Sequence, residues 1–102
     1  DNIMSIEAQK FPNTGESIQV GGMTVKGNAN TNVSISANTI IEVCDTSGSG
    51  SYVLLSDSSI GSAVDSSTSG AFYIPPYGTT RPFKTGDNTN IRGENVINIR
   101  EL

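Results

Sequence analysis

The side chains of this 102-residue chain that could do chemistry are hydroxyls, carboxylates, three lysines and one thiol, and no histidine accompanies them. Without histidine, Ser-His-Asp and Cys-His nucleophiles and histidine-ligated metal sites are excluded. Lys10, Lys26 and Lys84 are the only amines available as a base for a serine, and none of them lies in a catalytic motif. We therefore expect no catalytic residue and no enzymatic activity.

Carboxylates offer a second route to catalysis. Asp45, Asp57, Asp65 and Asp87 all lie in segments rich in Ser and Gly. Two carboxylates brought together by the fold can hydrolyse a glycoside, and because that pairing is spatial it stays open as an alternative. Aspartates in such segments also close turns by accepting hydrogen bonds from the backbone a few residues on. The turn interpretation is favoured.

Side-chain oxygens cluster at Asn28 to Asn32 and at Asp87 to Asn90, and such oxygens are the ligands that Ca²⁺ prefers. Neither segment matches the Asp-x-Asn-x-Asn-Gly loop. Glu94 follows Asp87 by seven residues, whereas the bidentate Glu of that loop follows its first Asp by about eleven. We predict turns at both places, no metal site and no cofactor.

The single cysteine, Cys44, cannot form a disulfide within the chain. Strand alternation places Ile41 and Val43 on one face and Glu42 and Cys44 on the other. No cation or histidine lies beside Cys44 in the sequence to activate its thiol. We interpret it as a small, half-buried residue, with an intermolecular disulfide as the alternative.

Aromatic residues offer a second route to ligand binding. Alternation along Ala71–Ile74 turns Tyr73 away from the face that Phe72 occupies, so Tyr73 and Tyr77 could form an exposed platform for a sugar or a protein. The favoured interpretation is that Phe72 and Phe83 belong to the core and that Tyr77 packs over the two prolines that precede it. The candidate interaction surface comprises Tyr73, Tyr77, Arg81 and Lys84.

The charge balance argues against several partners. The net charge is −4, and the six cations are spread along the chain rather than clustered. Neutralising phosphates requires several cations on one face, so we expect no nucleic-acid and no membrane partner. No apolar run approaches the roughly 20 residues of a membrane span.

The composition indicates strands. Ile and Val together number 18 against 3 Leu, while Ser, Thr, Asn and Gly supply 45 residues. β-branched residues favour strands, and small polar residues favour turns. Alternation and turn signals predict strands at Ser17–Val20, Met23–Lys26, Asn32–Ala37, Ile40–Cys44, Tyr52–Leu55, Ala71–Ile74, Arg81–Lys84 and Asn95–Arg100. Ser56 to Gly70 is predicted to be an exposed connection with a short edge strand at Ser62–Val64.

Seven or eight short strands at spacings of roughly ten residues are typical of a two-sheet sandwich. We predict an all-β, immunoglobulin-like antiparallel β-sandwich over residues 16–102, with a jelly roll as the alternative. Residues 1–15 have weak periodicity and are predicted to be an extended N-terminal arm.

Two segments, Ser69–Pro76 and Arg81–Asn88, resemble an immunoglobulin-like module of tailed-bacteriophage virion proteins found in tail, baseplate, fibre or decoration components. In that module a Gly-x-Phe-x-Ile-Pro strand precedes an Arg-x-Phe-(Arg/Lys)-Thr-Gly turn, and another strand follows. Asn30–Val33 and Asp65–Gly70 resemble its strand start and its run-in. The likeness extends over roughly Asn30 to Asn88.

The resemblance implies a spacer or decoration unit with no catalytic residues. The function expected from it is that of a non-enzymatic structural protein in a virion, contacting other virion proteins or copies of itself. The alternative is a carbohydrate- or protein-binding adhesion module of a bacterial or archaeal surface protein. That module would be extracellular or on the cell surface, with a host-surface glycan as its partner.

Overall fold

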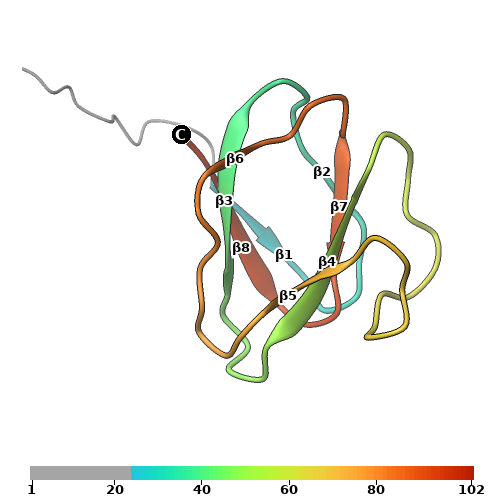
Figure 1. Cartoon of the computed structure of the whole chain (residues 1–102), viewed down its shortest axis with the longest axis vertical. Coiled ribbons are helices and arrows are strands. Elements are labelled where there is room, and N and C mark those ends of the chain that lie inside the picture. The colour runs from blue at the N-terminus through green and yellow to red at the C-terminus, as the bar shows by residue number, and fades with distance from the viewer. Residues whose placement is uncertain (1–23) are drawn as a thin grey trace, which may run out of the picture.

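The computed structural model describes residues 24–102, which form two four-stranded antiparallel sheets (Figure 1). The strands are β1 (Thr24–Gly27), β2 (Val33–Ser34), β3 (Ile40–Asp45), β4 (Ser51–Ser56), β5 (Phe72–Ile74), β6 (Phe83–Lys84), β7 (Asn90–Gly93) and β8 (Ile97–Glu101). The predicted all-β antiparallel sandwich of short strands is confirmed. In this part of the chain no helix is long and apolar enough to cross a membrane.

The topology is that of one long antiparallel ribbon folded on itself. β1 pairs with β8, β2 with β7, β3 with β6, and β4 with β5. Winding the ribbon also brings β3 beside β8 and β4 beside β7, which gives the sheet orders β1-β8-β3-β6 and β2-β7-β4-β5. Eight strands wound in this way form a jelly roll. Within the confirmed sandwich, the strand order is therefore that of the predicted alternative rather than the immunoglobulin order.

The core lies between the two sheets and consists of β-branched side chains. Ile41 and Val43 of β3 are fully buried, while Glu42 and Cys44 lie on the outer face of the same strand, as alternation predicts. Burial of each such side chain stabilises the fold by about 1.5–3 kcal/mol relative to exposure. The buried cluster comprises Ile35, Ile41, Val43, Val53, Ile74, Ile91, Ile97 and Ile99.

At the β6–β7 side, β6 is shorter than the predicted strand Arg81–Lys84, and β7 lies where alternation predicted no strand. β6 contains only Phe83–Lys84, because Pro82 has no N–H to donate to the ladder. The polar segment after Gly86 contains β7, in which Ile91 faces the core and Arg92 faces outward.

The connection from β4 to β5, residues 57–71, corrects one prediction. It contains no strand at Ser62–Val64, and it is not simply exposed, because Ile60 and Val64 are buried beneath it. The Asn30 side chain replaces a strand partner: its amide donates to Val64 O (3.1 Å), and its Oδ1 accepts from Val64 N (2.8 Å). Arg92 donates to Ile60 O at 2.9 Å. Side chains, rather than a ladder, thus satisfy this backbone.

The predictions for the N-terminal region lie outside the described residues. They are the arm at residues 1–15 and the strand at Ser17–Val20.

Candidate functional site: a tyrosine ledge

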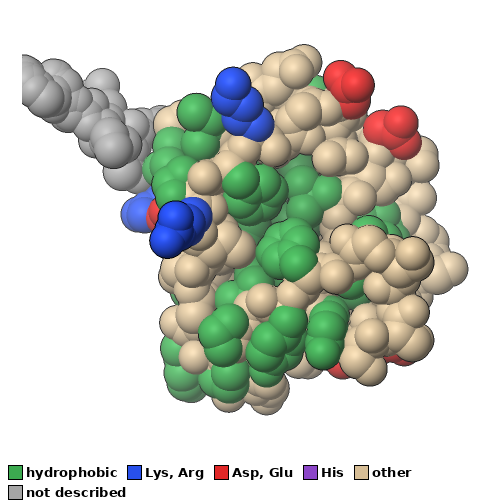
Figure 2. All heavy atoms as spheres, in the orientation of Figure 1, with side chains coloured by type: hydrophobic (Ala, Val, Ile, Leu, Met, Phe, Trp, Pro, Cys, Tyr) green, Lys and Arg blue, Asp and Glu red, His purple; other side chains and the backbone are tan. Residues whose placement is uncertain are grey.

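Tyr52, Tyr73 and Tyr77 form what we call the tyrosine ledge, beside the connection from β3 to β4. Tyr73 of β5 is 49% exposed, and Tyr77, just after β5, is 73% exposed. Tyr52 lies opposite Tyr73 across the β4–β5 pair, with ring centroids 4.9 Å apart. Figure 2 shows apolar side chains gathered at this end of the molecule. Tyr73 and Tyr77, predicted as part of one surface, therefore do lie at the same loop.

Two glycines of the β3–β4 connection allow the rings to lie against bare backbone. A Cβ on Gly48 would lie 2.6 Å from the Tyr77 hydroxyl, and a Cβ on Gly50 would lie 2.2 Å from the Tyr73 hydroxyl. Both glycines have φ near +80°, a conformation that side chains disfavour. The position of each tyrosine therefore depends on the glycine beneath it.

A buried carboxylate, Asp45, joins the β3–β4 connection to the turn that follows β5. Its oxygens accept hydrogen bonds from Ser47 Oγ (2.6 Å), Gly48 N (3.0 Å) and Gly50 N (3.3 Å) in one loop. They also accept one from Tyr77 N (3.1 Å) in the other. Asp45 is inaccessible to solvent, and such a group is stable only when its acceptors are satisfied.

The balance of forces on this carboxylate favours its charged form. Burial on its own would raise the pKa of Asp45, but the hydrogen bonds from Ser47, Tyr77, Gly48 and Gly50 together lower it below its ordinary value. Asp45 is therefore an ionised tether at neutral pH.

The backbone at Tyr77 is held in an uncommon conformation. Its φ is 56°, which is rare for a bulky residue and marks local strain. The preceding Pro75 fixes the chain, and its carbonyl accepts from Gly78 N at 2.8 Å. Together with the bond to Asp45, this turn fixes the backbone from which the Tyr77 ring projects toward solvent.

Of the two predicted cations, Lys84 lies away from the ledge. Lys84 pairs with Ile40 at the start of β3, and Asp45 ends that strand five residues later, a separation of about 17 Å. Arg81 lies between Tyr77 and Lys84 in the sequence and is exposed. The structure thus brings Tyr73 and Tyr77 together and places Lys84 apart from them, in a hollow lined also by Asn38, Thr39, Ile40 and Gly86.

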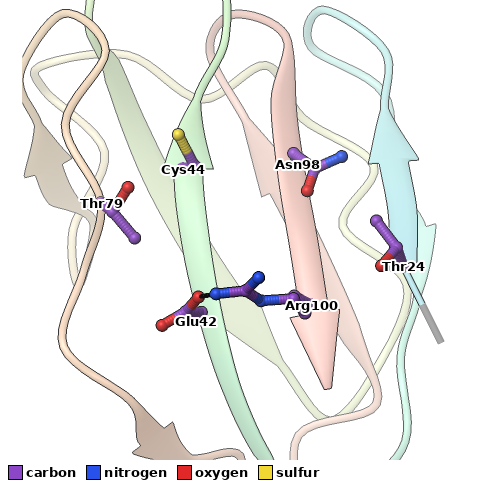
Figure 3. A pocket seen from close by; sticks show the side chains of 6 residues that line it. All are labelled: Thr24, Glu42, Cys44, Thr79, Asn98 and Arg100. Carbon is purple, nitrogen blue, oxygen red and sulfur yellow. Dashed lines mark hydrogen bonds and ion pairs between the residues drawn. The ribbon is translucent and has the colours of Figure 1, made fainter. Parts of the chain in front are cut away.

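A second, polar hollow lies on the outer face of the sheet formed by β1, β8, β3 and β6 (Figure 3). Its volume is about 340 Å³, and the Arg100 guanidinium within it is directed at Glu42, with which it forms an ion pair. Cys44 lies on the same face, with its Sγ 3.5 Å from the carbonyl oxygen of Asp45. The hollow is lined by Thr24, Glu42, Cys44, Thr79, Asn98 and Arg100.

Within residues 24–102, no group of three or more His, Cys, Asp or Glu is placed to hold a metal ion. The asparagine segment considered for calcium has other partners. Oδ1 of Asn30 accepts from Val64 N and from Arg92 Nε (3.0 Å), and a guanidinium at that distance would repel a cation.

Sequence reasoning missed the role of Asp45, although a signal was present. Asp45 continues the alternation of Ile41 and Val43, so it occupies a core-facing position of β3. A carboxylate there requires partners, and the following Thr-Ser-Gly-Ser-Gly supplies them. The long-range bond to Tyr77 has no counterpart in the local sequence.

The comparisons with known proteins add no assignment: no family model, no curated protein and no solved structure matches the chain.

Proposed function

We propose that this protein is a non-enzymatic structural component of a virus particle, held against a neighbouring virion protein by its tyrosine ledge. The observation that carries the proposal is the preformed ledge, two exposed tyrosines fixed over glycines by a buried carboxylate. Aromatic side chains held in one orientation bind partners with little loss of conformational entropy, and tyrosine is enriched at the centres of interfaces.

The virion setting is supported by two analogies. Jelly rolls are a recurrent fold of viral capsid proteins and of lectins. The strand and turn segments Ser69–Pro76 and Arg81–Asn88 also resemble a module of phage virion proteins. Because a fold does not fix a function, the particle itself must provide the test.

The test measures whether the protein belongs to a particle. Virus particles purified from the source of the chain are expected to contain it in a fixed ratio to the other virion proteins, measured by mass spectrometry. Substituting Tyr73→Ala and Tyr77→Ala together is expected to reduce incorporation at least tenfold, about the effect of losing one interface hot spot. Ile40→Ala removes a comparably exposed apolar side chain elsewhere and should leave incorporation unchanged. Absence of the wild-type protein from particles would overturn the proposal.

Carbohydrate binding is the second candidate, because exposed aromatic rings also stack on sugars. A glycan array probed with the full chain distinguishes the two. Specific sugar binding that disappears on Tyr77→Ala, by a protein absent from particles, would establish the adhesion function in place of the structural one.

A further inference from the structure

The polar hollow over β1, β8 and β3 has the size and the lining of a small ligand site. Its volume of about 340 Å³ lies near the lower end of the range for small-molecule sites. The strand register places Thr24, Arg100 and Glu42 in one row across the three strands, and Asn98 opposite Cys44 in the next row. The pleated sheet therefore holds these side chains at fixed positions on one face.

Several polar groups of the hollow have no partner within it. Among the six lining side chains, the ion pair of Glu42 and Arg100 is the only interaction (Figure 3). Asn98 is half-buried, and an amide in such a place normally has hydrogen-bond partners. The Arg100 side chain is 44% exposed, and a guanidinium carries more N–H donors than one carboxylate can engage. Donors and acceptors therefore remain for a ligand.

The charges of the hollow favour an uncharged ligand. Of the residues that the structure describes, only Arg100 and Glu42 bring charge to its lining, and their charges cancel. Lys26, opposite Asn98 on β1, is exposed but does not line the hollow. An ionic ligand would be repelled by one member of the pair and would compete with it for the other. A hydroxyl group avoids this conflict, because it can donate to a carboxylate and accept from a guanidinium.

We propose that this hollow binds a small uncharged polyol of the size of one sugar residue. One hydroxyl donates to the Glu42 carboxylate, a neighbouring hydroxyl accepts from the Arg100 guanidinium, and a third pairs with the Asn98 amide. The inference goes beyond the assembly function and does not depend on it. It also differs from stacking on the tyrosine ledge, because Tyr73 belongs to the other sheet and no aromatic side chain of residues 24–102 lines the hollow.

The test is an NMR titration of the ¹⁵N-labelled full chain with glucose, galactose, mannose and N-acetylglucosamine. At least one of these sugars is expected to shift the backbone signals of Asn98 and Arg100 saturably, with a dissociation constant of about 1 mM. Asn98→Leu keeps the size of the side chain but removes the amide, and should weaken binding roughly fivefold. Arg100→Lys keeps the charge but loses the planar fork, and should weaken binding as well. The spectra themselves show whether each variant is folded.

Controls fix the place and the chemistry of the site. Ser34→Ala removes an exposed hydroxyl from β2 of the other sheet and should leave the titration unchanged. Tyr77→Ala should also leave it unchanged, and loss of binding in that variant would assign the sugar to the ledge and overturn the hollow.

Glucuronic acid, the anionic counterpart of glucose, should bind no more tightly than glucose. A preference for the anion that weakens with salt would overturn the uncharged class of ligand. The proposal would also be overturned if none of the four sugars gave a saturable shift at concentrations far above the expected constant. Incorporation into particles through the ledge is measured independently and would survive each of these results.

Discussion

Two turns of this protein have nearly the same sequence but different surroundings. Asp45–Gly50 and Asp65–Gly70 share an Asp, a Ser two residues later, a Ser four residues later and a Gly five residues later. In both, the serine hydroxyl donates to the aspartate at 2.6 Å. The closing glycines have φ of 80° and 83°. Local sequence thus produces the same Asp–Ser bond and the same closing glycine twice, although the fourth residues differ: Gly48 N donates to the Asp45 carboxylate and Thr68 N to the Asp65 carbonyl.

The surroundings then give the turns different tasks. Asp45 ends a strand at a core-facing position and is inaccessible to solvent, whereas Asp65 lies in an exposed connection. Asp45 also accepts a bond from Tyr77, 32 residues away in the sequence, while the side-chain bonds of Asp65 stay within its own turn. The motif therefore closes a single loop at the surface in the Asp65 turn. In the Asp45 turn, nearly the same motif joins two loops under the tyrosine ledge.

The largest difference is expected from removing each charge. Asp45→Asn should lower the free energy of unfolding by about 2–3 kcal/mol, because a buried carboxylate with several donors is replaced by a group with one acceptor oxygen. Asp65→Asn should have a much smaller effect, because water can replace the partners of this exposed carboxylate. Urea unfolding of both variants measures this. Equal losses would mean that the two turns contribute alike and that burial is irrelevant.

The comparison also shows how far sequence reasoning reaches. The core strands were predictable because Ile41, Val43, Ile97 and Ile99 alternate with polar residues in short runs. The sheet order was not, because the ribbon pairing joins β1 to β8 and β2 to β7, and no local pattern specifies such distant partners. An exposed pair at Tyr73 and Tyr77 was weighed, but packing of Tyr77 over the prolines was favoured; the structure leaves both tyrosines exposed.

The remainder of the site required tertiary information. The role of Asp45 was missed because the residues around Asp45 and Asp65 are nearly the same. The local sequence therefore predicts a surface turn at both positions. The edge strand at Ser62–Val64 was wrongly predicted because Asn30 and Arg92 satisfy that backbone from distant parts of the chain. Hydrogen bonds from side chains to such distant backbone groups produce no periodic pattern in the sequence.

Glycine substitution tests the same contrast through packing. Gly50→Ala should destabilise by about 3 kcal/mol, since it adds both a disfavoured positive φ and a clash with Tyr73. Gly70→Ala should cost only the conformational part, about 1–2 kcal/mol, because its Cβ would meet only Leu54 at 3.5 Å. Thermal and urea unfolding give both values. The idea that the ring packs on bare backbone would be refuted if the two substitutions were equivalent.

The smallest and most selective effect is the pH dependence. The pKa of Asp45 is lower in the folded protein than in the unfolded chain, so ionised Asp45 favours folding. That contribution is complete above the unfolded pKa, about 3.9, and is lost as the pH falls through the folded value. The stability gap between wild type and Asp45→Asn should therefore be widest near neutral pH. It should narrow in acid, because a protonated carboxyl resembles the amide that replaces it. The corresponding gap for Asp65→Asn should change in the same direction but by much less, because hydrogen bonds from Ser67 and Thr68 also lower the pKa of Asp65 while solvent screens this exposed charge. A pH-independent gap at position 45 would assign its role to shape rather than charge.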